Sequence, residues 1–298
     1  MTSTPTELDT RTLEVPGAVL TYDVRPGPDG APVLLLVGSP MGAEGFGTLA
    51  GYFPDRTVVT YDVRGAGRSR RTDGAPTNTP EEHAGDLSAV IDAVGGGPVD
   101  LFATSGGAIN ALTLVARRPG QVRTLVAHEP PSLRYLPDAE EASAATHAVA
   151  EAYRQGGRGP GMAAFIRLVG HRGPVTADFA GPAPDPALFG LPTEDDGARD
   201  DALLAQNMLS STHAEFDVAA LQSAPTRVVV AVGEGSEGQL ARRGGEGVAA
   251  ALGTAPVLFP GDHGGFMGGE FGQAGEPEAF AARLRAVLDG EVPDGTAV

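Results

Sequence analysis

The chain alternates short apolar runs with segments of helical character, and this alternation limits it to a small set of folds. Residues Val33–Val37 form a continuous apolar run, which is typical of a strand buried on both faces. A helix is predicted at Pro80–Val94, where Thr79 is the cap and Glu82 completes a capping box. Strands that alternate with helices predict a parallel sheet covered by helices, an α/β fold. The further predicted strands are Ala18–Val24, Thr57–Tyr61, Val99–Thr104 and Val122–Ala127, and the next helix is Gly107–Arg117.

The alternation stops near residue 130 and resumes near residue 215. Residues 131–215 contain helical candidates and no convincing strand, so we expect a helical cap inserted into the α/β core. The expected domains are the first part of the core at 1–130, the cap at 131–215 and the second part of the core at 216–298. The first dozen residues are polar and are expected to be frayed. The later candidates are helices at Ala139–Gln155, Gly161–Val169, Ala198–Ser211 and Glu276–Leu288, and strands at Arg227–Val232 and Pro256–Phe259.

The composition excludes several kinds of chemistry and of partner. The chain has no Cys, and its 21 basic residues are all Arg, so thiol and lysine nucleophiles are absent. A formal net charge of −17 argues against nucleic acid or an anionic membrane as a partner. No apolar stretch is long enough to span a bilayer, and the first residues lack the features of a signal peptide. We therefore expect a cytoplasmic protein with a small-molecule substrate, while its oligomeric state stays open.

The most specific motif is Ala103-Thr104-Ser105-Gly106-Gly107, which follows a predicted strand and opens a predicted helix. This is the context of a nucleophile elbow, usually written G-x-S-x-G, in which a serine lies on a strained turn. The positions two before and two after the serine must be small, because neighbouring backbone crowds them. Ala103 and Gly107 meet this requirement, although Ala103 replaces the usual glycine. The alternatives are a plain glycine-rich turn and a phosphate cradle, and the second lacks the lysine of a P-loop.

Three further segments follow predicted strands, at 38–42, 62–69 and 259–266. Taken in order with the elbow, they resemble the α/β-hydrolase fold family, in its branch of serine esterases and cofactor-free haloperoxidases. The resemblance covers nearly the whole chain outside residues 131–215. It implies an α/β-hydrolase fold, with a mostly parallel central sheet flanked by helices and a helical cap insertion. It also implies that no cofactor is needed.

The resemblance assigns roles to four residues. Ser105 would be the nucleophile, and His263, which follows the last predicted strand, would be the general base. The oxyanion hole would use the backbone N–H groups of Gly106 and Ser39. In the family, the loop that carries the residue equivalent to Ser39 often has the sequence His-Gly-x-Pro. Here Val37 replaces the histidine of that sequence. This replacement removes a side chain that stabilises the loop but leaves the N–H of Ser39.

The acid of the triad is where the sequence departs from the family. The family usually carries Asp three residues after the glycine that ends the strand near Val232, and this position is Ser236 here. Glu129 is the favoured substitute, because it follows the predicted strand at 122–127. If the strand order follows the family, a carboxylate at the end of that strand can reach His263. Alternatively, Glu129 caps a helix or forms an ion pair at the base of the cap. The other candidates are Glu234, and after it Glu237, Asp262 or no acid.

The remaining histidines and the cap carry weaker signals. His83, His147 and His171 are expected in or beside surface helices, whereas His128 and His213 flank the cap and could line a pocket. No metal-ligand spacing and no complete dinucleotide fingerprint occur, so no metal site is expected. An apolar pocket, or an ordinary cap core, is suggested by Phe165, Leu168, Phe179, Phe189 and Met208.

These patterns together predict a serine hydrolase. It would cleave an ester or related acyl bond of a small, largely apolar molecule through an acyl-enzyme, with Ser105, His263 and Glu129 as its triad. The alternatives are a lyase, a cyclase or a C–C bond hydrolase of secondary metabolism on the same scaffold, and a hydrolase homologue that only binds a ligand. Because Ser105 stands at the elbow, the Asp nucleophile of epoxide hydrolases and haloalkane dehalogenases is not expected.

Overall fold

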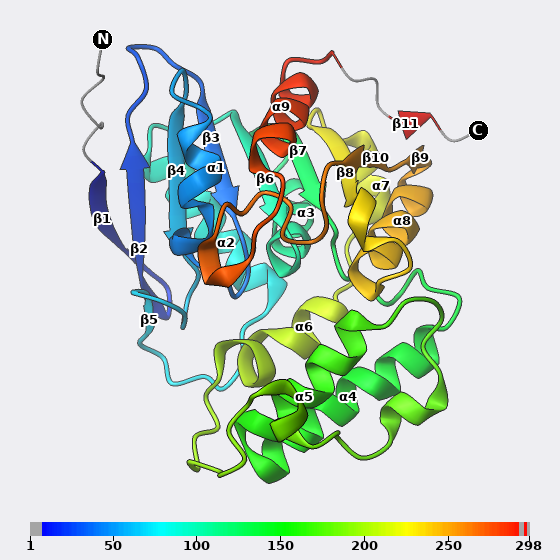
Figure 1. Ribbon diagram of the computed structural model, residues 1–298. Helices are drawn as coiled ribbons and strands as arrows, with labels where there is room; N and C mark the ends of the chain where they lie inside the picture. Colours follow the sequence, from blue (N-terminus) through cyan, green and yellow to red (C-terminus); the bar gives the residue numbers. More distant parts are fainter. Residues whose placement is uncertain (1–7, 292–294, 297–298) are drawn as a thin grey trace.

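The computed structural model describes residues 8–291 and 295–296. In this part of the chain, a nine-stranded sheet has the order β1-β2-β4-β3-β6-β7-β8-β10, and β5 pairs with β2 (Figure 1). The strands from β4 to β10 along this order pair in parallel, whereas β1, β2 and β5 pair antiparallel at one edge. The bounds are β1 Asp9–Val15, β2 Ala18–Arg25, β3 Val33–Val37, β4 Thr57–Asp62, β5 Arg70–Arg71, β6 Val99–Thr104, β7 Val122–His128, β8 Arg227–Gly233 and β10 Val257–Phe259; β9 Thr254–Ala255 pairs separately with β11 Gly295–Thr296.

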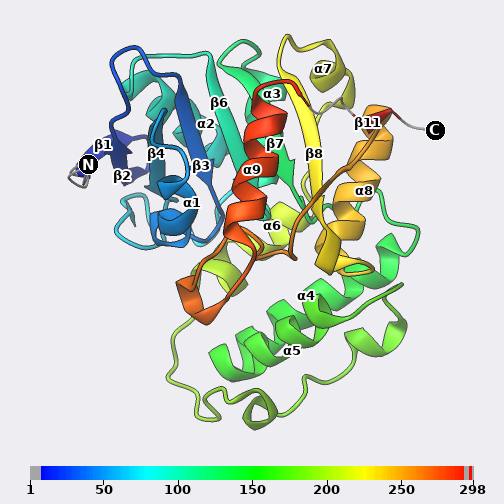
Figure 2. The same cartoon turned by 45° about the horizontal axis from the view of Figure 1, so that its top comes forward.

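Helices cover both faces of this sheet (Figure 2). Helices α2 (Pro80–Ala93), α3 (Gly106–Arg117), α7 (Val218–Ser223) and α8 (Leu240–Leu252) supply side chains to the apolar cluster on one face. Helices α1 (Gly47–Gly51) and α9 (Pro277–Leu288) supply them on the other face. Short 3-10 helices lie at Ala43–Phe46, Glu234–Ser236 and Glu270–Gly272. Within the described ranges, no helix combines the length and the apolar character needed to cross a membrane.

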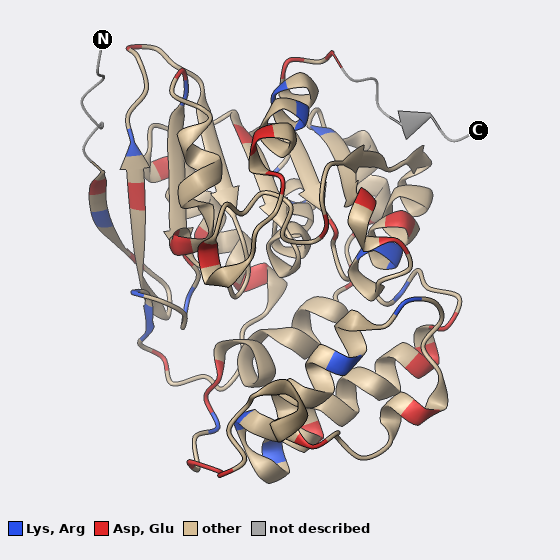
Figure 3. Ribbon diagram, viewed as in Figure 1, with Lys and Arg blue, Asp and Glu red and all other residues tan. Residues whose placement is uncertain are grey.

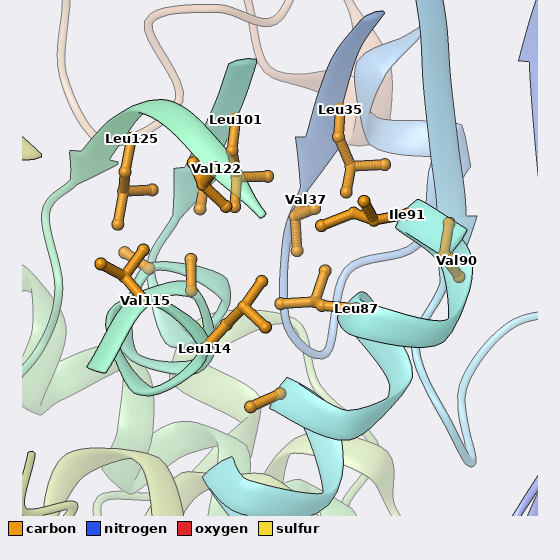
Figure 4. Close-up of a cluster of buried hydrophobic side chains, with 14 of the residues drawn as sticks. Leu35, Val37, Leu87, Val90, Ile91, Leu101, Leu114, Val115, Val122 and Leu125 are labelled. Atoms are coloured by element: carbon orange, nitrogen blue, oxygen red, sulfur yellow. The ribbon is translucent and has the colours of Figure 1, made fainter. Parts of the chain in front are cut away.

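The continuous apolar run of β3 is explained by burial on both faces. Leu34 and Leu36 join the cluster that contains α1 and α9, while Leu35 and Val37 join the cluster that contains α2 and α3. Successive side chains of a strand point to opposite faces, so a strand covered on both sides must be apolar at every position. Figure 4 shows Leu35 and Val37 lying beside side chains of α2. The α/β fold class predicted from the alternation is therefore confirmed.

The start of α2 is formed by the residues that predicted it. The Thr79 hydroxyl accepts a hydrogen bond from the Glu82 N–H, and the Glu82 carboxylate accepts one from the Thr79 N–H. Pro80 occupies the first turn, where its missing N–H has no intrahelical partner to lose. This local pattern fixes the N-terminal end of the helix at Pro80, the residue where it was predicted to begin.

Two expectations about the core were wrong. The first dozen residues are not all frayed, because Asp9–Val15 form β1 and pair along their whole length with β2; residues 1–7 lie outside the described part. Most of β1 is exposed, so it lacks the alternating apolar pattern that predicts a strand. Helix α8 was also missed, because its sequence LARRGGEGVAAAL contains three glycines, which are poor helix formers.

Residues 131–215 form a group of helices that lies beyond the carboxyl ends of the parallel strands (Figure 1). The helices are α4 (Ala139–Gly156), α5 (Arg158–Gly170) and α6 (Met208–Thr212), with 3-10 helices at Ala177–Ala180 and Pro186–Phe189 and a π-helix at Ala202–Asn207. All of these residues are described, and they contain no strand beyond an isolated bridge from Arg172 to Gln239. We call residues 131–215 the helical segment. The expected regular helix at 198–211 is instead a π-helix followed by one short α-helix.

Candidate active site

Four loops that carry the predicted site residues leave the carboxyl ends of parallel strands. Ser39 follows β3, Ser105 follows β6, Glu129 follows β7 and His263 follows β10. The carboxyl ends of parallel strands meet at one edge of a sheet, which is where ligands bind in open α/β folds. The fold therefore brings together side chains that lie up to about 220 residues apart in the sequence.

Ser105 lies on a sharp turn between β6 and α3. Its backbone has φ 56° and ψ −131°, an uncommon conformation for a residue with a side chain, and its N–H donates to the His128 carbonyl at 2.9 Å. A Cβ on Gly107 would lie 2.8 Å from the Val37 carbonyl oxygen, so this position accepts only glycine. Ala103 is fully buried. The local geometry thus explains why the motif needs small residues on both sides of the serine.

The loop after β3 lies directly against this turn. A Cβ on Gly106 would lie 2.8 Å from the Ser39 carbonyl oxygen, which is a measure of how closely the two loops approach. The N–H groups of Ser39 and Gly106 form no hydrogen bond within the described residues. Free N–H groups from these two loops are what an oxyanion hole requires.

Glu129 is the carboxylate that contacts the histidine. Its side chain is completely buried, and Oε2 lies 2.6 Å from His263 Nδ1. Its other oxygen, Oε1, accepts a hydrogen bond from the Gly233 N–H at 2.9 Å. The Glu129 backbone has a positive φ of 47° and its N–H donates to the Ala231 carbonyl, so the turn after β7 is held against β8. These contacts hold the Glu129 carboxylate against Nδ1 of His263 and leave Nε2 of the ring without that partner.

The pKa values of this pair are shifted in opposite directions. Burial raises the pKa of Glu129, but the hydrogen bond from His263 and neighbouring positive charge outweigh it and lower the pKa to about 2. Burial lowers the pKa of His263, and the hydrogen bond to Glu129 outweighs it, so the pKa of His263 rises above 6.5. Glu129 is therefore a permanent anion at neutral pH, and it strengthens His263 as a base.

The other candidate acids do not reach His263. Glu234 and Glu237 are exposed and Ser236 is buried, and none of the three contacts the histidine within the described residues. Asp262 is exposed, and among the described residues its carboxylate accepts a hydrogen bond only from the Gly264 N–H, at 2.9 Å.

A cavity of about 470 Å³ is lined by both Ser105 and His263. Ser105, Gly106, Ser39 and His263 all line it, and the His263 side chain is 42% exposed within it. Ser105 and His263 form no hydrogen bond with each other in this part of the chain, which is common in unliganded catalytic sites. Three of the five expected apolar residues, Phe165, Leu168 and Met208, line the cavity, whereas Phe179 and Phe189 do not.

The chain resembles known proteins in sequence and in fold. A family model described as alpha/beta hydrolase fold matches residues 31–166. An uncharacterized hydrolase, YraK, of Bacillus subtilis (strain 168) is 36% identical over 127 residues, which are 42% of this chain and 46% of that protein. The match therefore spans about half the length of that relative.

Solved structures extend the likeness to nearly the whole chain. A thermophilic esterase from Thermogutta terrifontis matches with a TM-score of 0.63 and 22% identity, covering 95% of this chain and 98% of that one. The carboxylesterase CesB of Bacillus subtilis matches with a TM-score of 0.61 and 18% identity, covering 97% and 94%. The chain therefore has an α/β-hydrolase fold. At these identities the solved structures establish the fold alone.

The histidines of the chain correct two expectations. His83 does not lie on the surface: it is buried, and its Nε2 lies 2.7 Å from the Asn207 Oδ1 in the helical segment. Neither His128 nor His213 lines the cavity. His128 is buried beneath the site, where its ring stacks on that of His263 with centroids 6.0 Å apart. His213 is exposed and contacts Ser143.

Two residues of the candidate site were missed from the sequence, and a third was given another role. Gly233 donates its N–H to Glu129, and Asn207 lines the cavity from the π-helix. His128, which was expected to line a pocket, stacks instead on the ring of His263. The position of His128 immediately before Glu129 was a usable signal, because residues at the end of a central strand lie close to the site. In the described ranges, no group of three or more His, Asp or Glu side chains is arranged to hold a metal ion.

Proposed function

We propose that this chain is a serine hydrolase that cleaves an ester or related acyl bond of a small, largely apolar molecule through an acyl-enzyme. The observation that carries the proposal is the buried contact between Glu129 and His263 behind a cavity that Ser105 also lines. Two of the fold neighbours are named as esterases, which agrees with acyl-transfer chemistry.

The first half of the proposed reaction forms the acyl-enzyme. His263 Nε2 takes the proton of the Ser105 hydroxyl as the serine oxygen attacks the carbonyl carbon of the ester. The carbonyl oxygen becomes an oxyanion, which accepts hydrogen bonds from the N–H groups of Ser39 and Gly106. The tetrahedral intermediate collapses, its bond to the alcohol oxygen breaks, and His263 protonates the departing alkoxide.

The second half releases the acid. Water attacks the acyl carbon while His263 takes one of its protons, and collapse of the second tetrahedral intermediate returns that proton to Ser105. Glu129 stays ionised throughout, holds the N–H of His263 Nδ1 and stabilises the imidazolium that forms twice in the cycle. We further propose that the helical segment acts as a cap, since it supplies most of the apolar wall of the cavity.

The proposal predicts how the rate depends on pH. His263 acts as a base only when it is neutral, and its pKa lies above 6.5 because of the bond to Glu129. We expect kcat/KM to fall as the pH drops through the pKa of His263. A Glu129→Gln variant removes the negative charge, so its remaining activity should persist to lower pH than that of the wild type. A profile that does not move contradicts the role given to Glu129.

The decisive test is modification of the nucleophile. The wild type and Ser105→Ala would be treated with a fluorophosphonate and supplied with p-nitrophenyl butyrate. We expect stoichiometric labelling and turnover of the wild type, and neither with the variant. If the wild type is neither labelled nor active although it is folded, the serine-hydrolase proposal fails. Labelling without ester turnover would favour a lyase, a cyclase or a C–C bond hydrolase on the same site.

The acid has a matched control within the same chain. Glu129→Gln should lower kcat by about 10⁴-fold, which is the typical cost of losing the triad acid. Glu234→Gln removes an exposed carboxylate that does not contact His263, so its kcat should stay within about twofold of the wild type. Equal effects of the two substitutions would remove Glu129 from the triad.

A further inference from the structure

The charges that line the cavity are of one sign. Among the described residues that line it, Asp262 is the only acid, His263 is the only histidine, and no arginine is present. The chain contains no lysine at all. A substrate carboxylate or phosphate in this cavity would therefore find no arginine or lysine to pair with.

Asp262 is not neutralised by a partner. Its Oδ1 accepts the Gly264 N–H, and within the described residues it forms no ion pair. The side chain is exposed and stands one residue before His263, on the loop after β10. A second carboxylate, that of Glu129, lies behind His263 and is ionised at neutral pH. The cavity is thus lined beside His263 by a carboxylate that forms no ion pair among the described residues.

Two arginines that contact the residues following β8 make their hydrogen bonds outside the cavity: Arg172, which follows α5, and Arg242 of α8. Arg172 donates to the carbonyls of Gly235 and Glu237, at 2.8 Å and 2.6 Å. Arg242 donates to the Gly233 carbonyl at 2.9 Å and pairs with Glu246 at 2.8 Å. Neither arginine lines the cavity. Acidic residues occur on both the α/β core and the helical segment (Figure 3). The formal net charge of the whole chain is −17.

We propose that the cavity selects by charge: it accepts uncharged and cationic acyl groups and rejects anionic ones, and Asp262 is a specificity-determining residue for this choice. The inference rests on the proposed acyl-transfer function and names its substrate class more closely. In a partly apolar cavity the Asp262 carboxylate repels an anionic acyl group and so weakens its binding. The same carboxylate attracts a cationic acyl group.

The test uses three p-nitrophenyl esters with acyl groups of similar length. One is the monoester of adipic acid, whose far end is a carboxylate; the second carries a carboxamide there, which is isosteric and polar but uncharged; the third carries a trimethylammonium group. The carboxamide ester separates the effect of charge from that of polarity. We expect kcat/KM for the carboxamide ester to exceed that for the carboxylate ester by about 30-fold, and the cationic ester to be at least as good as the carboxamide.

The outcomes distinguish this inference from the function on which it rests. If the folded wild type hydrolyses none of the three esters, the acyl-transfer proposal fails. If it hydrolyses the carboxamide and carboxylate esters with kcat/KM values within threefold of each other, the charge selection is wrong although the hydrolase function stands. A rise in salt from 20 mM to 500 mM should lower the ratio of kcat/KM for the carboxamide ester to that for the carboxylate ester, because salt screens exposed charges.

The role of Asp262 is tested by the ratio of the two rates in Asp262→Asn. The substitution also alters the surroundings of His263, but this effect is common to all three esters and cancels in the ratio. We expect the preference for the carboxamide over the carboxylate ester to fall by about five- to tenfold. Glu234→Gln, which removes an exposed carboxylate outside the cavity, is the control and should leave the ratio within twofold.

Two results would overturn the role of Asp262. One is an unchanged ratio in Asp262→Asn. The other is an equal change in Glu234→Gln, which would assign the selection to the net charge of the whole protein. If Asp262→Asn is not folded by circular dichroism, Asp262→Ser provides a second variant, because its hydroxyl can still accept the Gly264 N–H.

Discussion

The α/β core and the helical segment are stabilised by different means. The core has an apolar cluster on each face of the sheet and contains buried ion pairs, such as Arg56 with Asp100 at 2.5 Å. The helical segment has one smaller cluster, to which Leu240 of α8 also belongs, and its pair of Arg154 with Glu151 is exposed. The candidate nucleophile, base and acid all belong to the core, whereas the helical segment forms most of the apolar wall of the cavity.

The ion pairs of the two regions offer the sharpest contrast. Asp100 is fully buried between Arg56 and Arg123, so Asp100→Asn leaves the buried guanidinium of Arg56 with only the longer contact to the half-exposed Asp289, at 3.3 Å. We expect a loss of about 3–5 kcal/mol in the free energy of unfolding, measured in urea. Glu151→Gln in the helical segment should change it by less than about 0.5 kcal/mol, because exposed pairs contribute little. Similar losses would mean that both regions depend equally on charge.

Cavity-forming substitutions test the same contrast in apolar packing. Leu101 in β6 is fully buried in the core, and Leu204 in the π-helix is 3% exposed. We expect Leu101→Ala to cost about 4–5 kcal/mol and Leu204→Ala about 2–3 kcal/mol, since irregular helices can move to fill part of the void. Urea unfolding of both variants measures this difference. A larger loss for Leu204→Ala would show that the helical segment is packed as tightly as the core.

Truncation of a cavity residue is expected to affect binding and not chemistry. Phe165 of α5 lines the cavity, and Phe189 lies on the same segment outside it, where it is 37% exposed. With p-nitrophenyl butyrate, Phe165→Ala should raise KM by about tenfold, about 1.4 kcal/mol, while kcat stays within threefold. Phe189→Ala should leave both constants unchanged. A fall in kcat with an unchanged KM for Phe165→Ala would instead place the helical segment in the chemical step.

The smallest expected effect concerns acid stability. Burial lowers the pKa of His128 to about 4, so the unfolded chain binds a proton below pH 6.5 that the folded chain does not bind until about pH 4. The His128 contribution to stability therefore falls as the pH drops from 6.5 towards 4. Relative to the wild type, His128→Phe should gain about 1–2 kcal/mol between pH 7 and pH 5 in urea unfolding. His213→Phe, in the helical segment, is the exposed control; an equal gain there would contradict the buried origin of the effect.

The sequence predicted features that depend on neighbouring residues. The capping box at Thr79 and the turn at Ser105 each lie within a few residues of their partners, so their types and spacing reveal them. The contact of Glu129 with His263 joins positions 134 residues apart, and the sequence left it open among several acids. It depends on β7 and β10 both lying beside β8, which local patterns do not contain.

Helix α8 illustrates how tertiary contacts override local preference. A Cβ on Gly244 would lie 2.7 Å from the Pro130 carbonyl oxygen, and one on Gly247 would lie 2.7 Å from Tyr135 Cβ. These glycines lower the helix propensity and so hid the helix, yet they allow it to lie directly against the chain that follows Glu129. A helix was predicted at 198–211, but local patterns did not indicate its π-helical turn at Ala202–Asn207, where Asn207 contacts His83 and Asn78 of the core.

The order of the site residues along the chain has a consequence for synthesis on the ribosome. Ser105 and Glu129 emerge early, and the whole helical segment must follow before β10 brings in His263. Domains fold as their residues emerge, so the nucleophile and the acid can be in place while no base is yet available to them. If the proposed function is correct, a nascent chain that stalls before residue 263 lacks its base, and its activity begins only after β10 and the loop that carries His263 have been added.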